Sequence, residues 1–150
     1  MTHTIFVICT DRCDEVVIVT FTARLREAGY RVQLVSLFGP IVRGINGIGI
    51  ACDMTVSDAL AVGHGAVAVI MPDSGAGLGH GIDPRMDHFL AQASEAQALV
   101  VRCTANGDLT ATSIPNLLPS QQIVYRKGMP LEQIVDLVIG TLPLRSSSPA

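Results

Sequence analysis

Three apolar runs constrain the fold of this chain more than any other feature. They cover residues 5–9, 66–71 and 98–102 and read IFVIC, AVAVIM and ALVVR. Continuous runs of this length are typical of strands buried on both faces, as in a parallel sheet between two layers of helices. Because helix-like segments lie between the runs, the sequence predicts an α/β fold with a mostly parallel sheet flanked by helices on both faces.

The segments between these runs carry start and stop signals for the other elements. Acidic residues open the first helix-like segment and Gly29 follows it as a stop, while a later segment tolerates Pro84 in its first turn. Helices are predicted over residues 14–28, 83–96 and 130–142, with a short one capped by Thr55 or Ser57 and ending at Val62. Further strands are predicted over residues 31–37, 109–113 and 122–125, and a turn-rich ribbon over 38–50. We expect a single domain over residues 1–144 and a flexible tail over 145–150.

The composition excludes several classes of protein. Hydrophobic residues make up 49% of the chain and charged residues 15%, which fits a compact domain with a large core and excludes a disordered chain. The formal net charge is −3 and Lys and Arg form no cluster, so we expect no nucleic-acid partner. No apolar stretch reaches the roughly 20 residues of a membrane span, and the first residues lack the basic segment of a signal peptide. We therefore expect a cytoplasmic protein with no membrane partner.

Among four scattered cysteines, Cys103 is the candidate for chemistry. None of the four shows metal-binding or redox spacing, so we expect free thiols and no metal site. We also expect no organic cofactor. Cys103 closes the predicted strand over residues 98–102 and is followed by the turn-forming residues TANG. Ligands of open α/β sheets bind at the carboxyl edge of the strands, so a thiol on a turn at this edge is a candidate nucleophile. The alternative is a small residue buried in the core, where unpaired cysteines are often found.

Four stretches, in this order and spacing, resemble the ThiJ/PfpI superfamily, which is related to the class I glutamine amidotransferases. The first is the acidic pair Asp14-Glu15, which opens the first predicted helix, and the second is a ribbon followed by a D-x-x-x-x-D-A segment, over residues 42–59. The third is a glycine-rich loop over residues 70–77, and the fourth is a nucleophile elbow over residues 99–105. The resemblance covers residues 4–113. It implies a flavodoxin-like or class I glutamine amidotransferase-like fold, and it also implies a homodimer.

The resemblance further implies a cysteine-dependent active site for a small-molecule substrate. Cys103 is the expected nucleophile, and Glu15 faces it as a proton acceptor or, if protonated, as a hydrogen-bond donor to the thiolate. Backbone N–H groups are expected to hold the negative charge that develops on the substrate. The candidate oxyanion- and substrate-binding residues are Ser74, Gly75, Thr104, His80 and Asp73. Such a site suits hydration, hydrolysis or lyase-type addition at a carbonyl-like or nitrile-like carbon.

Two departures from the family pattern keep other functions open. Asp73-Ser74 replaces the double glycine of the family, and the long helix that follows the elbow in family members is expected to be missing before the strand over residues 109–113. Without this helix, its dipole does not stabilise the thiolate. The alternative function is a non-catalytic redox-sensing or binding and dimerisation module with a degenerate site. A sulfur-relay protein that carries a persulfide is a third hypothesis.

Other residues suggest weaker hypotheses. The glycines of residues 75–79 are compatible with a phosphate loop, but no G-K-[ST] motif accompanies them. His64 is expected in a turn and His88 on a helix surface. Arg43 and Arg102 are further candidates for orienting an anionic substrate.

Overall fold

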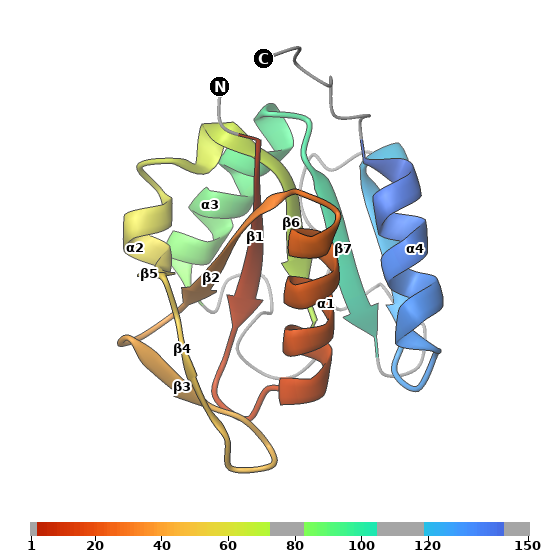
Figure 1. Ribbon diagram of the computed structural model, residues 1–150. Helices are drawn as coiled ribbons and strands as arrows, with labels where there is room; N and C mark the ends of the chain where they lie inside the picture. The colour runs from red at the N-terminus through yellow and green to blue at the C-terminus, as the bar shows by residue number, and fades with distance from the viewer. Residues whose placement is uncertain (1–2, 73–82, 105–118, 143–150) are drawn as a thin grey trace.

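The computed structural model describes residues 3–72, 83–104 and 119–142, which form a six-stranded sheet, a two-stranded ribbon and flanking helices (Figure 1). The strands of the sheet are β1 (Thr4–Cys9), β2 (Arg31–Ser36), β5 (Met54–Thr55), β6 (Ala66–Met71), β7 (Leu99–Thr104) and β8 (Gln122–Arg126). The ribbon pairs β3 (Ile41–Arg43) with β4 (Gly49–Ala51) in antiparallel fashion. The helices are α1 (Glu15–Glu27), α2 (Val56–Ala59), α3 (Pro84–Glu95) and α4 (Leu131–Thr141), with 3₁₀ turns at Gly63–Gly65 and Pro119–Gln121.

Every pairing in the six-stranded sheet is parallel, in the order β5-β2-β1-β6-β7-β8. Successive side chains of a strand point to opposite faces. On β1, Ile5 and Val7 therefore enter one hydrophobic core, while Phe6 and Ile8 enter another on the opposite face. Because both faces are covered, a strand in this position has to be apolar at every residue, and the prediction of a buried parallel sheet is confirmed.

Two layers of helices close the two faces of the sheet. Figure 1 shows α1 in front of the strands and α3 behind them, and α4 lies beside α1 while α2 lies beside α3. The first core lies under α1 and α4 and includes Phe21 and Val138. The second core lies under α2 and α3 and includes Phe89, whose ring meets that of Phe6 edge-on at 5.3 Å between centroids. Burying each such ring contributes roughly 1.5–3 kcal/mol to folding.

Two elements end more than one residue away from the sequence-based prediction. β7 continues through Cys103 and Thr104, which pair with β8, so Cys103 lies within a strand and not on the turn after it. Pairing with β8 satisfies the backbone groups of these residues and overrides their local preference for a turn. The helix predicted to reach Val62 is shorter, since α2 ends at Ala59, but Thr55 caps it as predicted and forms a capping box with Asp58.

Several predictions fall outside the described residues. They are the strand over residues 109–113, the missing helix after Cys103, residues 73–81 of the glycine-rich loop predicted over 72–81, and the tail over residues 145–150. Of the helices within the described ranges, none combines the length and apolar character that a membrane crossing requires.

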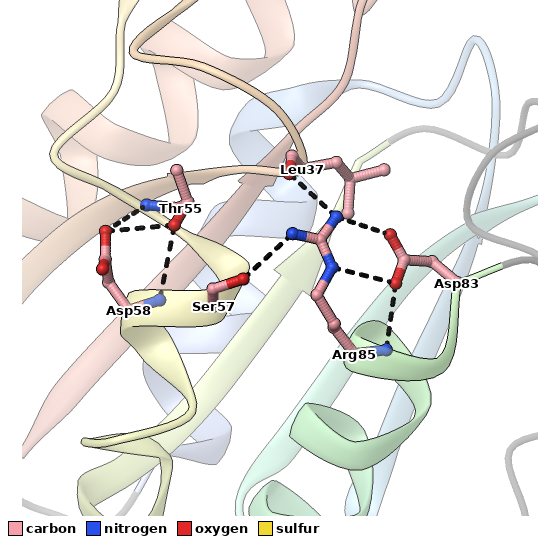
Figure 2. A network of polar contacts seen from close by, with 6 residues as sticks. All are labelled: Leu37, Thr55, Ser57, Asp58, Asp83 and Arg85. Atoms are coloured by element: carbon pink, nitrogen blue, oxygen red, sulfur yellow. Dashed lines mark hydrogen bonds and ion pairs between the residues drawn. The ribbon is translucent and has the colours of Figure 1, made fainter.

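A polar clamp ties the start of α3 to the end of β2 and the start of α2 (Figure 2). Arg85 donates to both carboxylate oxygens of Asp83, from Nε at 3.2 Å and from Nη2 at 2.8 Å. It also donates to Ser57 Oγ at 2.9 Å and to the carbonyl oxygen of Leu37 at 3.1 Å. These hydrogen bonds from Arg85 hold the pKa of Asp83 below its usual range, so the carboxylate remains charged as the N-cap of α3. The clamp thereby fixes three elements at the carboxyl edge of the sheet.

Candidate active site

Cys103 lies near the carboxyl end of β7, beside Tyr125 of the neighbouring strand β8. The two residues are register partners, and both side chains pack against the first core. Cys103 is half-buried, so it is not sealed inside the core. In Figure 1 the strand arrows of β1 and β7 point to the edge where α1 begins. This is the edge at which ligands of open α/β sheets bind.

A cavity of about 260 Å³ opens beside Cys103. Its walls come from the start of α1, the turn of the ribbon, the residue after β6 and the segment between β8 and α4. The described lining includes Arg12, Asp14, Ile45, Tyr125 and Lys127. Pockets for drug-sized ligands measure roughly 300–1,000 Å³, so this cavity suits a smaller molecule.

The charges around this cavity favour an anion. Arg12 and Lys127 are exposed at its rim. The N-terminus of α1 brings the positive end of the helix dipole to the same place, because its N-cap Asp14 lines the cavity. Asp14 supplies the opposing negative charge, and it is engaged with the amides of Val16 and Val17 at 3.0 and 3.4 Å. The described lining of the cavity therefore has two cationic side chains and the positive end of a helix dipole, and one carboxylate, that of Asp14, opposes them.

Glu15 is buried at the first turn of α1, where its carboxylate accepts hydrogen bonds from the turn of the β3–β4 ribbon. The amide of Asn46 donates to both of its oxygens, at 3.1 and 2.9 Å, and the side-chain Nδ2 of Asn46 donates at 3.1 Å. The amide of Ile48 donates at 3.0 Å. Within the described lining of the Cys103 cavity, α1 contributes Asp14 and Val17, while Glu15 is directed at this turn. The carboxylate thus joins α1 to the ribbon.

The hydrogen bonds to Glu15 determine its protonation. Burial raises the pKa of Glu15, but the donors from Ile48, its own backbone and Asn46 together lower this pKa below the usual value. Glu15 is therefore a carboxylate at neutral pH and acts as a hydrogen-bond acceptor. Gly44 allows this arrangement, because a Cβ at residue 44 would overlap the carboxyl group of Glu15.

A Glu15→Gln substitution is expected to lower the free energy of unfolding at neutral pH. The difference from the native protein should disappear at acidic pH. The amide replaces one acceptor oxygen by a donor that faces the N–H groups of Asn46 and Ile48. The pKa of Glu15 is lower in the folded protein than in the unfolded chain, where it is about 4.3. The Glu15 carboxylate therefore stabilises the fold fully above about pH 4.3, and this stabilisation is lost as the pH falls through the folded-state pKa. Urea denaturation of both proteins across this pH range measures the difference.

A matched control for Glu15→Gln is Glu27→Gln, which alters an exposed carboxylate at the other end of α1. This control should change the unfolding midpoint little at any pH. A difference between the native protein and Glu15→Gln that stays constant down to about pH 3 would contradict the lowered pKa of Glu15.

The structure describes only part of the predicted site. Thr104 ends β7 and pairs with Arg126. Ser74, Gly75, His80 and Asp73 lie outside the described residues, so the proposed oxyanion and substrate contacts there stay predictions. Within the described ranges, no cluster of three or more His, Cys, Asp or Glu side chains could hold a metal ion.

The candidate arginines and histidines take other positions. Arg43 donates to the carbonyl oxygen of Gly47 at 3.0 Å, inside the ribbon. Arg102 is buried and alternates with Cys103 along β7, so it points to the opposite face of the sheet, where burial lowers the pKa of its guanidinium. His88 is exposed on α3, as predicted, and His64 is exposed in a 3₁₀ turn.

Sequence reasoning missed four residues of this region. Tyr125 and Lys127 come from β8 and the turn after it, more than twenty positions along the chain from Cys103, and join the cavity only because β8 pairs with β7. The sequence places Asn46 and Ile48 only in a turn-rich ribbon. The Asn46-Gly47 pair is a turn signal, but nothing in its sequence indicates that its amides bind Glu15.

A larger and more open cavity, of about 760 Å³, lies at the opposite edge of the sheet. His3, His64, Gln97 and Gln121 are among its described lining residues. It is formed around the amino ends of β6 and β7, far along the strands from Cys103. Because ligands of this architecture bind at the carboxyl edge, the smaller cavity beside Cys103 is the better candidate for an active site.

Comparisons with solved structures identify the fold. The Drosophila melanogaster protein DJ-1beta gives a TM-score of 0.77 at 16% sequence identity, over 95% of this chain and 91% of that chain. The putative protease I from Bacteroides thetaiotaomicron gives 0.75 at 8% identity, over 94% of this chain and 99% of that chain. A two-domain protein from Anabaena variabilis, with DJ-1/ThiJ/PfpI-like and ferritin-like domains, gives 0.71 at 14% identity, over 99% of this chain and 52% of that chain. No family model and no curated protein matches the sequence. The predicted ThiJ/PfpI-like, class I glutamine amidotransferase-like fold is confirmed.

Proposed function

We propose that this chain, which has the DJ-1/ThiJ/PfpI fold, is a small enzyme that uses Cys103 as a nucleophile on a small electrophilic substrate. The observation that carries the proposal is the half-buried Cys103 at the carboxyl edge of the sheet, opening on a cavity beside the N-terminus of α1. A cationic rim and a helix N-terminus stabilise negative charge, and a nucleophilic sulfur needs this stabilisation. The reaction is hydration, hydrolysis or a lyase-type addition at a carbonyl-like or nitrile-like carbon.

The chemistry begins with the thiolate of Cys103. Its sulfur forms a bond to the electrophilic carbon, and the π electrons of the carbonyl or nitrile move to the oxygen or nitrogen. Backbone N–H groups near Thr104 and in residues 74–75 hold this charge. With a nitrile, water then adds to the thioimidate carbon, its protons pass to the nitrogen, and the carbon–sulfur bond breaks to release the amide and the thiolate. With an amide, the amine first leaves with a proton from solvent to give a thioester, and water then attacks the same carbon, so that the carbon–sulfur bond breaks and the acid and the thiolate are released. Glu15 acts as a positioning residue, because its carboxylate holds the ribbon turn, which contributes Ile45 to the cavity, against the start of α1.

The cavity indicates the class of substrate. Its volume of about 260 Å³ admits a molecule of about ten heavy atoms. Arg12 and Lys127 at the rim favour a substrate with a carboxylate or another anionic group beside the reacting carbon. A small 2-oxo acid, or a small nitrile that carries a carboxylate, fulfils both conditions.

The proposal is tested with the native protein and a panel of small aldehydes, 2-oxo acids, amides and nitriles. Turnover of at least one class is expected, together with a covalent adduct on the tryptic peptide over residues 103–126 when the reaction is trapped. Anionic members of the panel should react faster than neutral analogues of the same size. No turnover and no adduct with any class would overturn the enzymatic proposal.

One observation favours a second candidate function, a non-catalytic redox-sensing or binding module. The carboxylate of Glu15 is already engaged by four hydrogen bonds from Asn46 and Ile48. The Glu15 carboxylate therefore stabilises the packing of α1 against the ribbon, whether or not Cys103 is a nucleophile. Selective oxidation of Cys103 by peroxide, without turnover of any substrate, would support this second function.

The exposed apolar side chains around α1 support the proposal of a homodimer. Val16 and Val19 on α1 are 60% and 58% exposed, and Ile45 and Ile48 on the adjoining ribbon turn are 60% and 58% exposed. The hydrogen bonds of Glu15 hold these two elements together, so we group the four side chains as one candidate interface, here called the α1–ribbon patch. A second copy of the chain is the proposed occupant, and the cytoplasm is the proposed location.

A Val19→Asp substitution is expected to weaken the dimer by about 10²-fold or more, because it places a charge among the apolar side chains of the proposed interface. Sedimentation velocity over a range of concentrations measures the change. The matched control is Leu137→Asp on α4, which is 53% exposed outside the α1–ribbon patch and should leave association unchanged. Equal association of native protein and Val19→Asp would contradict this interface.

A further inference from the structure

Three cysteines other than Cys103 gather at one corner of the first core. Cys9 ends β1 and Cys13 lies in the connection to α1, and both are buried. Cys52 lies between β4 and β5, is half-buried and packs against the same core. The proposed function uses none of these thiols. No disulfide joins the four cysteines, all of which lie in the described ranges.

The backbone holds Cys52 against the part of the sheet that contains Cys9. The residue after Cys52 is fixed to β2 twice: the amide of Asp53 donates to the carbonyl oxygen of Leu34 at 2.8 Å, and the amide of Leu34 donates to the Asp53 carboxylate at 2.7 Å. Leu34 is the register partner of Val7 in β1, two residues before Cys9. The amide of Cys52 itself donates to the carbonyl oxygen of Pro40 at 2.8 Å. The side chains of Cys9 and Cys52 pack at the same core and share a hydrogen bond.

The two thiols of this pair have different properties. The hydrogen bond with Cys52, together with burial, raises the pKa of Cys9 far above its usual value. The same hydrogen bond lowers the pKa of Cys52, against the opposing effects of burial and of the charge on Asp53. Each thiol also has a backbone acceptor, since Cys9 Sγ donates to the carbonyl oxygen of Val7 at 3.6 Å and Cys52 Sγ to that of Ile50 at 3.9 Å. The more exposed sulfur of the pair is also the one that more readily becomes a thiolate.

We propose that Cys9 and Cys52 form a reversible intramolecular disulfide when a hydroperoxide oxidises Cys52, at a redox site separate from Cys103. Cys52 is the reactive thiol, because it is accessible and its thiolate is stabilised by a neighbouring S–H group. Cys9 is the resolving thiol, because it is already in hydrogen-bond contact with Cys52 and is shielded from solvent. The site therefore takes a small peroxide as oxidant and a dithiol as reductant.

The steps balance as follows. The Cys52 thiolate attacks one oxygen of the hydroperoxide, an S–O bond forms, the O–O bond breaks, and the second oxygen leaves as water or alcohol after protonation. Cys52 is then a sulfenic acid, and two electrons have passed from its sulfur to the peroxide. The sulfur of Cys9 attacks the sulfur of Cys52, an S–S bond forms and the S–O bond breaks, and the hydroxide leaves as water with the proton of Cys9. One hydroperoxide is consumed for each disulfide, and a dithiol restores both thiols.

The disulfide would tie the end of β1 to the strand connection that follows β4. Both β4 and the turn before it belong to the ribbon that carries Ile45 and Ile48. In Figure 1 this ribbon lies at the same end of the molecule as the end of β1 and the start of α1. Oxidation is therefore expected to restrain the ribbon next to both the Cys103 cavity and the α1–ribbon patch.

The sequence offers a direct test, because trypsin separates all four cysteines. Cys9, Cys13, Cys52 and Cys103 fall on the peptides over residues 1–12, 13–24, 44–85 and 103–126. The native protein and a Cys103→Ser variant are treated with one equivalent of hydrogen peroxide, blocked with an alkylating agent, digested and analysed by mass spectrometry. We expect peptide 1–12 linked to peptide 44–85 in both proteins, with a mass lower than the sum of the two by two hydrogens. Dithiothreitol should remove the link.

Two variants separate the roles of the thiols. Cys52→Ser should abolish the link and leave Cys9 unoxidised at this dose. Cys9→Ala should also abolish the link, but a sulfenic acid on Cys52 should then be trapped by dimedone. A far-ultraviolet circular dichroism spectrum checks that each variant folds, and the native protein carries the test if Cys9→Ala does not.

Three results would overturn the proposal. They are a link between peptides 1–12 and 13–24 in place of the expected one, the absence of any link in the native protein, and equal peroxide reactivity of Cys9 in Cys52→Ser. None of these results depends on the proposed activity of Cys103, since the Cys103→Ser protein gives the same readout.

Discussion

Replacing Cys103 by Ser should reduce turnover by at least about 10³-fold and leave the fold intact, if the proposed function is correct. A hydroxyl has nearly the size of a thiol, so a half-buried strand residue tolerates the change. It is, however, a far weaker nucleophile, because it does not ionise near neutral pH even beside a helix N-terminus. Steady-state kinetics with the best substrate of the panel measure the loss. The unfolding midpoint in urea, which should be close to that of the native protein, shows that the fold is retained.

The matched control for Cys103→Ser is Cys52→Ser, which changes the other half-buried thiol. Turnover should be unchanged in this control, because Cys52 lies outside the lining of the Cys103 cavity. Turnover by Cys103→Ser within a few-fold of the native rate would refute the nucleophile, and the second candidate function, a redox-sensing or binding module, would then be favoured.

Replacing Gly44 by Ala should break the link between α1 and the ribbon. The added Cβ would overlap Cγ, Cδ and Oε1 of Glu15, and the carboxylate can avoid it only by leaving the amides of Asn46 and Ile48. Overpacking of a tight site costs about 1–3 kcal/mol, and the lost hydrogen bonds to a charged acceptor add to this cost. Urea denaturation should show the destabilisation. Amide hydrogen exchange should show faster exchange at Asn46 and Ile48.

The effect of Gly44→Ala should extend to the proposed active site, because Ile45 forms part of the Cys103 cavity. Gly49→Ala in the same ribbon is the matched control. A Cβ at residue 49 would meet Ile41 Cγ2 at 3.5 Å, an ordinary van der Waals contact, so its effect on stability should be within roughly 0.5 kcal/mol. Equal stability of the two glycine variants would show that Glu15 adapts freely and does not anchor the ribbon.

The strands and helices could be predicted because their signals are local. The run over residues 66–71 is β6 without any change of boundary, and the helix predicted from Asp83-Pro84 is α3, with Asp83 as its N-cap. Continuous apolar runs and capping residues reflect interactions within a few positions along the chain, so one sequence contains the information. β7 shows the limit of this reasoning. Its last two residues belong to the strand only because β8, about twenty residues further on, pairs with them.

The candidate site was predictable only as far as its position. The sequence indicated that Cys103 lies at the carboxyl edge and that Glu15 opens α1, and the structure has both residues at that edge. It did not indicate that Tyr125 and Lys127 join the Cys103 cavity. It did not indicate either that Glu15 is surrounded by amides of the ribbon. These contacts connect residues more than twenty positions apart, and no periodicity or spacing records them.

By itself, the amino-acid sequence determined the class of fold, the places where its strands and helices begin, and the edge of the sheet that carries Cys103. It did so because hydrophobic periodicity, helix capping and turn preferences act between near neighbours. Only the tertiary structure decided which partners each functional side chain has: the acceptor role of Glu15, the residues around the Cys103 cavity, and the contact of Cys9 with Cys52. The protonation and reactivity of these groups depend on atoms brought close by the packing of distant segments, and therefore on the folded chain as a whole.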